Sequence, residues 1–121
     1  MAKILLAEDD ESMRNFLCMA LERAGHEVTP AHDGLDALAA LDKDKAFDLL
    51  LADIIMSGMD GIELSQLAAK KRPGLKVMFI TGFAAVAMGQ RNPAHANAKV
   101  LSKPFHLRDL VEQVESILAA A

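Results

Sequence analysis

Acidic residues stand at two places in the chain where a short apolar run ends. Glu8 and Asp9 follow one such run, and Asp53 follows another. Carboxylates held close together repel one another, and their charged forms persist when a cation screens them. Hard oxygen ligands of this kind suit Mg²⁺, which binds through one or two carboxylates and leaves positions for water and phosphate oxygens. If the two runs lie side by side, their acidic residues predict a magnesium site.

Two further polar residues follow apolar runs in the second half of the chain. Thr81 comes directly after residues 77–80, and Lys103 comes soon after residues 99–101. A carboxylate accepts a phosphoryl group to form an acyl phosphate, which makes Asp53 the expected nucleophile. The transferred oxygens need fixed positive charge and hydrogen-bond donors, which Lys103 and Thr81 supply. Together with the magnesium ligands, these residues predict a phosphoryl-transfer site.

Short apolar runs alternate along the chain with stretches whose apolar residues recur at the three-and-four spacing of one helix face. The continuous run at residues 49–52 is typical of a strand covered on both faces. We expect strands at 4–7, 27–31, 49–52, 77–80 and 99–101, and helices at about 13–24, 34–43, 62–72, 84–91 and 107–118.

This alternation predicts an α/β fold with a doubly wound, flavodoxin-like parallel sheet of five strands in the order 2-1-3-4-5. In such sheets, ligands bind beyond the carboxyl ends of the strands, near the point where the strand order reverses. Neighbouring strands lie about 4.8 Å apart, so the ends of the first and third strands bring Asp9 and Asp53 close enough to share one ion.

Composition excludes several other classes of protein. The 121 residues suit one domain, and their net charge of −4 provides no basic surface for nucleic acid. The chain has no Trp or Tyr on which single-stranded bases would stack. The single cysteine, Cys18, cannot close a disulfide within the chain, and no apolar run is long enough to span a membrane. We therefore expect a cytoplasmic protein that binds neither nucleic acid nor a membrane.

Four segments resemble, in order and spacing, the receiver domain of two-component response regulators, and the resemblance covers essentially the whole chain. They are ILLAEDDESMR, DIIMSGMDG, FITGF and LSKPF. The resemblance implies the CheY-like form of the predicted fold and assigns roles to six residues: the Mg²⁺ ligands Glu8, Asp9, Asp53 and the carbonyl of Ile55, and the phosphoryl contacts Thr81 and Lys103.

Two positions depart from the usual pattern of the family. Ser57 stands where many receivers have proline, so we expect a looser loop after Asp53. Val100 replaces the aromatic residue whose rotamer typically changes together with the switch threonine, here Thr81. The usual aromatic readout of phosphorylation is therefore not expected here.

The resemblance also implies the partners. A phosphohistidine on a sensor histidine kinase or a histidine phosphotransfer protein would donate the phosphoryl group. The chain ends after its last expected helix, so we expect one receiver domain over 1–121, without an output domain, acting by protein contact as a monomer or weak dimer. Through TGFAA and LSKPFHLRDL it is similar to the CpdR type of stand-alone receivers of alphaproteobacteria, which are adaptors for an ATP-dependent protease. A chemotaxis-type motor switch and a phosphorelay intermediate are the alternative outputs.

Three other interpretations remain open at this point. The acidic cluster that begins at Asp9 is also typical of helix capping without a metal. A magnesium-dependent phosphohydrolase would use the same nucleophile, but such enzymes usually carry a second carboxylate two residues later, where this chain has Ile55. A degenerate receiver would serve as a constitutive binding module. We expect a signalling protein rather than an enzyme with turnover.

Overall fold

The apolar runs of the sequence become the strands of one parallel sheet, and the described amphipathic stretches form helices that cover its faces. The computed structural model describes residues 2–44, 46–81, 99–102 and 106–120. Its elements are β1 (Lys3–Ala7), α1 (Glu11–Arg23), β2 (Glu27–Ala31), α2 (Gly34–Lys43), β3 (Leu49–Asp53), α3 (Gly61–Lys71), β4 (Lys76–Thr81), β5 (Lys99–Ser102) and α5 (Leu107–Ala119).

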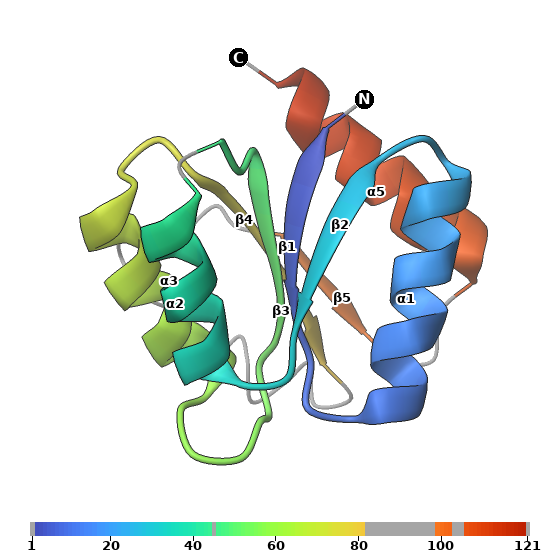
Figure 1. Ribbon diagram of the computed structural model, residues 1–121. Helices are drawn as coiled ribbons and strands as arrows, with labels where there is room; N and C mark the ends of the chain where they lie inside the picture. The colour runs from blue at the N-terminus through green and yellow to red at the C-terminus, as the bar shows by residue number, and fades with distance from the viewer. Residues whose placement is uncertain (1, 45, 82–98, 103–105, 121) are drawn as a thin grey trace.

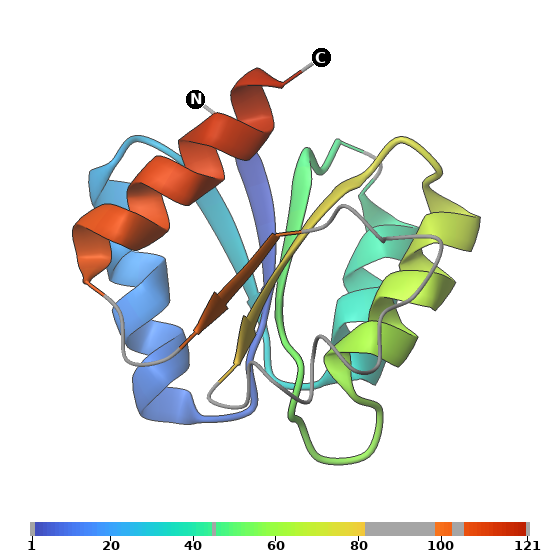
Figure 2. The ribbon, with the colours of Figure 1, turned by 180° about the vertical axis from the view of Figure 1, so that it is seen from behind.

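The five strands run parallel in the order β2-β1-β3-β4-β5. Helices α2 and α3 cover one face of the sheet, and α1 and α5 cover the other (Figures 1 and 2). The predicted doubly wound α/β fold and its strand order are therefore confirmed. The helix expected at 84–91 lies outside the described residues.

The side chains of each central strand point alternately to the two faces, as the period of two in a strand requires. In β1, Leu5 packs into the core under α2 and α3, whereas Ile4 and Leu6 pack into the core under α1 and α5. All five residues of β3 are buried. This double coverage explains why the run at 49–52 shows no alternation of apolar and polar residues.

Aspartates cap the amino ends of three helices. Asp10 accepts a hydrogen bond from the backbone N–H of Met13, Asp33 from that of Asp36, and Asp60 from that of Glu63. Each bond satisfies one of the backbone donors that a helix leaves free at its start. The capping interpretation of the first acidic cluster thus holds for Asp10 and leaves Glu8 and Asp9 without that explanation.

No helix within the described ranges has the length and apolar character needed to cross a membrane.

Candidate functional site

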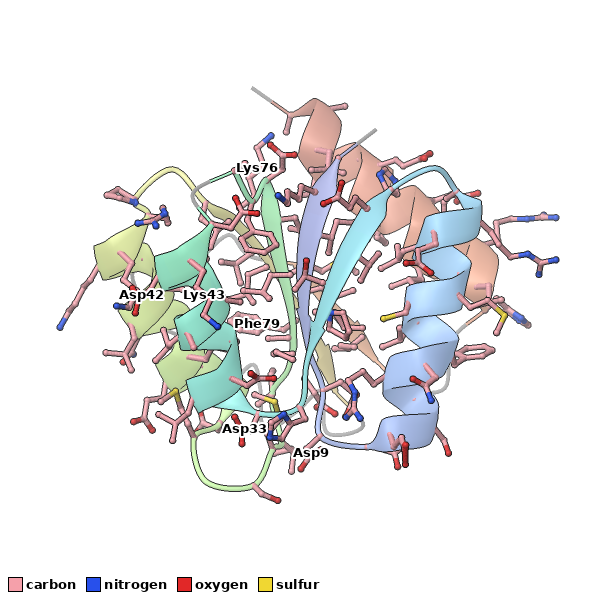
Figure 3. All side chains as sticks on the ribbon, in the orientation of Figure 1. Asp9, Asp33, Asp42, Lys43, Lys76 and Phe79 are labelled. Carbon is pink, nitrogen blue, oxygen red and sulfur yellow. The ribbon has the colours of Figure 1, made fainter. Side chains whose placement is uncertain are left out.

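The carboxyl ends of β1 and β3 place three acidic side chains together. The two strands are neighbours with Ala7 opposite Ala52, so the next residues along the chain are Glu8 and Asp53. One carboxylate oxygen from each of Glu8, Asp9 and Asp53 lies within 4.8 Å of the others. Figure 3 shows Asp9 at this edge of the sheet, beside the loop that follows β3.

Two of these three carboxylates are buried. Glu8 is fully buried and Asp53 is 5% exposed, whereas Asp9 is exposed. A backbone N–H reaches each buried carboxylate: that of Asp10 donates to Glu8 Oε2 at 3.1 Å, and that of Ile55 donates to Asp53 Oδ1 at 3.1 Å. Buried like charges at adjacent strand ends are costly unless a cation compensates them. Positive charge at this edge, from a side chain or from a bound cation, therefore stabilises the arrangement.

The donor set fits Mg²⁺. Oxygen ligands bind Mg²⁺ at about 2.1 Å, so two ligands on opposite sides of the ion are about 4.2 Å apart. Ligands at adjacent positions of the octahedron are about 3.0 Å apart, so three carboxylate oxygens within 4.8 Å of one another need to approach by less than about 2 Å to bind one ion. Among the described residues, Oδ1 of Asp9 accepts no hydrogen bond, which leaves one oxygen of this exposed carboxylate available. Ile55 follows in the loop, and its carbonyl as a fourth ligand stays a prediction.

The loop between β3 and α3 is anchored to the strand that carries Asp53. The N–H of Ile54 donates to the carbonyl of Ile80 at 2.9 Å, and the N–H of Gly61 donates to the carbonyl of Ile54 at 2.9 Å. A Cβ atom on Gly61 would lie 2.3 Å from the backbone oxygen of Asp53. The start of α3 can therefore approach the main chain of Asp53 this closely because residue 61 has no side chain.

Ser57 binds one of the acidic residues, a contact that the sequence analysis missed. Its backbone N–H and its hydroxyl both donate to Asp9 Oδ2, at 3.0 and 3.2 Å. A serine offers two donors here where a proline offers none, and the expected loosening of the loop stays a prediction. The replacement of the family's proline was the available signal, but its partner, 48 residues away, could not be read from the pattern.

The remaining predicted site residues are only partly described. Thr81 is the last residue of β4, the neighbour of β3, so its backbone stands at the same edge of the sheet as Asp53. The side chain of Thr81 and all of Lys103 lie outside the described residues, as does the side chain of Val100. Their roles at the site stay predictions.

Arg14 also lies at this edge of the sheet and was not predicted. Its Nη1 donates to the backbone carbonyl of Glu8 at 2.9 Å. The guanidinium joins the first turns of α1 to the end of β1 and brings a positive charge near the acidic cluster. An arginine six residues after an acidic residue is too common a pattern to have indicated this contact.

Comparison with known proteins agrees with this architecture. The family described as the response regulator receiver domain matches residues 4–115. The response regulator receiver protein CpdR of Brucella abortus (strain 2308) is 56% identical over 121 residues, covering 100% of both chains.

Solved structures show the same fold. The chemotaxis protein CheY4 of Vibrio cholerae superposes with a TM-score of 0.87 at 28% identity, over 97% of this chain and 98% of that one. The response regulator protein TrrA of Thermotoga maritima, in complex with Mg(2+)-BeF, has a TM-score of 0.83 at 26% identity, over 97% of this chain and 99% of that one. The chain belongs to the response regulator receiver domain family, and it is close to the stand-alone receiver CpdR.

Proposed function

We propose that this receiver is a phosphorylation-controlled signalling switch whose phosphoryl acceptor is Asp53. The donor is a phosphohistidine on a sensor histidine kinase or a histidine phosphotransfer protein. The proposed Mg²⁺ ligands are Glu8, Asp9, Asp53 and the carbonyl of Ile55. The observation that carries the proposal is the convergence of three carboxylates, two of them buried, within 4.8 Å at the ends of adjacent parallel strands.

The chemistry assigned to Asp53 is a transfer between two nucleophiles. An oxygen of its carboxylate bonds to phosphorus, the P–N bond of the phosphohistidine breaks, and the electron pair of that bond stays on the imidazole nitrogen. Bound Mg²⁺ supplies positive charge that offsets the carboxylates and the charge on the transferred oxygens. The N–H of Ile55 holds Asp53 Oδ1, which orients the carboxylate for attack through its other oxygen.

The proposed readout depends on the charge that phosphorylation adds. A phosphoryl group brings about −1.5 to −2 charges to the site. Lys103 and the Thr81 hydroxyl then move toward the new oxygens, as in the family that the chain resembles. Thr81 ends β4, and β5, the strand that precedes Lys103 in the chain, is the last strand of the sheet, so this movement changes the surface on that side of the molecule.

The test is the intact mass of the protein after incubation with Mg²⁺ and either acetyl phosphate or a phosphorylated donor kinase. Wild-type protein is expected to gain one PO₃ unit, and Asp53→Asn is expected to gain none. Asp42→Asn is the matched control because Asp42 is exposed on α2, far from the acidic cluster, and should be phosphorylated normally. Absence of the adduct from wild-type protein under both donors would refute the proposal.

Two further measurements distinguish the other interpretations. Sustained release of phosphate from a generic phosphomonoester would indicate a phosphohydrolase, whereas the switch forms one adduct per chain. A constitutive binding module would show no amide shifts near Thr81 and Val100 on addition of Mg²⁺ with beryllofluoride, whereas the switch is expected to show them.

The proposed output is a protein contact, with an ATP-dependent protease as the partner that the CpdR-type resemblance suggests. The proposed phosphoryl donor and the proposed protease both act in the cytoplasm, so the proposal includes a cytoplasmic location. Affinity capture with wild-type protein and with Asp53→Ala, each with and without the phosphoryl donor, tests this part. We expect one partner whose capture from wild-type protein changes with the donor and whose capture by Asp53→Ala does not change.

A further inference from the structure

The contact between Ser57 and Asp9 joins two loops at the acidic edge of the sheet. Both donors of Ser57 converge on Oδ2 of Asp9, at 3.0 Å from the backbone nitrogen and 3.2 Å from the hydroxyl oxygen. Hydrogen bonds to an ionised carboxylate are stronger than those between neutral groups. In the part of the chain that the structure describes, the second oxygen of Asp9 accepts no hydrogen bond. One oxygen is therefore held while the other remains available.

The path of the loop around Ser57 directs its N–H toward Asp9 in the structure without an ion. Met56 is buried in the core beneath α2 and α3. Gly58 has a φ of +76°, a left-handed conformation that side-chain-bearing residues rarely adopt. The loop closes on itself through the bond from Gly61 N–H to the Ile54 carbonyl. Ser57 itself is exposed and makes no other hydrogen bond among the described residues, so its contact with Asp9 is its main structural role.

We propose that Ser57 is a positioning residue for the metal site: it holds the exposed Asp9 carboxylate toward Asp53 and so favours Mg²⁺ binding. An unrestrained aspartate at the surface must give up side-chain freedom when it binds an ion. Outer hydrogen bonds that orient a ligand reduce this cost and contribute to metal affinity. The inference rests on the proposed function, because it concerns the same ion. It assigns a role to Ser57, which stands where many receivers have a proline. A proline has neither the N–H nor the hydroxyl that Ser57 donates.

The test is a titration of metal-free protein with Mg²⁺, followed by the backbone amide shifts of residues around β1 and β3. Ser57→Ala removes the hydroxyl and keeps the N–H, and we expect it to weaken Mg²⁺ binding about tenfold, the lower end for outer partners of metal ligands. Ser57→Thr keeps both donors and should bind within about twofold of wild type. Ser57→Pro removes both donors and should bind more weakly than Ser57→Ala. Ser12→Ala, at an exposed serine of α1, is the control and should match wild type.

A second readout examines the contact without any metal. In the presence of EDTA, the amide proton of Ser57 should resonate downfield in wild-type protein because it donates to a carboxylate, and it should move upfield in Asp9→Ala. The urea midpoint of each variant, followed by circular dichroism, shows whether it is folded. Ser57→Ala and Ser57→Thr replace an exposed side chain and are expected to keep the wild-type midpoint.

Some results would overturn the proposal. Equal Mg²⁺ affinity of wild-type protein and Ser57→Ala would show that the serine does not prepare the site. Tighter binding by Ser57→Ala would show that its donors compete with the ion for Asp9. An unchanged Ser57 amide shift in Asp9→Ala would show that the contact is absent in solution. Phosphorylation of Asp53 in the presence of Mg²⁺ is measured on wild-type protein, without any Ser57 variant. It therefore tests the proposed function separately from the role of Ser57.

Discussion

Gly61, the first residue of α3, lies directly against the main chain of Asp53. The space there holds the hydrogen atom of a glycine and no larger side chain. A Cβ at residue 61 would meet the backbone oxygen of Asp53 at 2.3 Å and its carbonyl carbon at 2.9 Å. Both atoms belong to the last residue of a central strand, where Asp53 pairs with Ile80 of β4, so neither can move without disturbing this pairing. The same glycine therefore serves the fold and the placement of Asp53, the proposed phosphoryl acceptor.

We expect Gly61→Ala to lower the free energy of unfolding by at least about 2 kcal/mol, because either β3 or the start of α3 must shift. It should also slow adduct formation at Asp53. Gly74→Ala is the matched control: nothing lies within 4 Å of the Cβ that it would add, so its effect should stay within about 0.5 kcal/mol. Urea unfolding followed by far-ultraviolet circular dichroism is the suitable measurement, since the chain has no Trp or Tyr. Equal midpoints for the two variants would contradict the prediction.

The carboxylate of Asp44, at the end of α2, gives stability a dependence on pH. Its hydrogen bond with the Lys3 ammonium, together with the N–H of Ala46, lowers the pKa of Asp44 below its usual value of 3.8. A folded-state pKa below the unfolded one stabilises the protein above that unfolded value. This stabilisation is lost as the pH falls through the folded-state value.

We therefore expect the urea midpoint of wild-type protein to exceed that of Asp44→Asn at neutral pH, and the difference to shrink as the pH falls below about 4. Repeating the comparison in a Lys3→Met background removes the main cause of the shift. In that background, the two urea midpoints should differ by less, and their difference should change less with pH. A difference that stays constant from pH 7 to pH 3 would argue against the contact.

At the scale of elements, the end of α5 is attached to the sheet by one side chain. Lys76, the first residue of β4, donates from Nζ to the carbonyls of Ile117, Leu118 and Ala120 at 2.9, 3.2 and 2.5 Å. The carbonyl of Ile117 also accepts from the backbone N–H of Ala120, and a cation at this helix end compensates the negative end of the helix dipole. Figure 3 shows Lys76 near the C-terminus, at the opposite end of the sheet from Asp9.

We expect Lys76→Met, which keeps most of the apolar stem, to speed amide exchange in the last turn of α5. The variant should also lose about 1 kcal/mol of stability. Lys43→Met is the control, because Lys43 is exposed in the last turn of α2 and donates no hydrogen bond to a described residue. Exchange in α5 that is the same in both variants would show that the helix end is held by packing alone.

The elements could be predicted because their patterns are local. The run at 49–52 needed no partner to be recognised, and the structure extends it by one residue, to Asp53. The first helix begins at Glu11 rather than near residue 13, because Asp10 caps it and the apolar pattern starts only within its first turn. Prediction from periodicity places a helix by its buried face, so its polar first residues are missed.

The acidic site could be predicted for a different reason: strand order alone brings Glu8 and Asp53 to one edge, whatever the loops do. The contact between Ser57 and Asp9 could not be predicted, because it depends on the path of the loop. That path is set by the burial of Met56 and by the left-handed φ of Gly58, and neither the burial nor the dihedral angle is a property of the local sequence.

At the scale of the whole molecule, the two ends of the sheet differ in the kind of contact that they hold. The end where the strands begin holds contacts that fasten elements, such as those of Lys76 with α5 and of Lys3 with Asp44. The end where they finish collects carboxylates that repel one another, two of them buried. Stabilising contacts at one end thus accompany, at the other, the three carboxylates that are proposed to hold Mg²⁺.

From this difference between the two ends, we predict that Mg²⁺ reverses the order of stability of wild-type protein and Asp53→Asn. In EDTA, Asp53→Asn should be more stable than wild-type protein by about 1–2 kcal/mol, because it removes one buried charge from the cluster while its side-chain oxygen still accepts from the Ile55 N–H. Mg²⁺ at 100 times its dissociation constant should stabilise wild-type protein by about 2.7 kcal/mol, and should stabilise the variant much less. The order of the two urea midpoints should therefore reverse between EDTA and Mg²⁺, while Asp42→Asn follows wild type in both. If Asp53→Asn is the less stable protein in EDTA, the carboxylates are not in conflict without an ion, and the acidic edge is not the strained part of this fold.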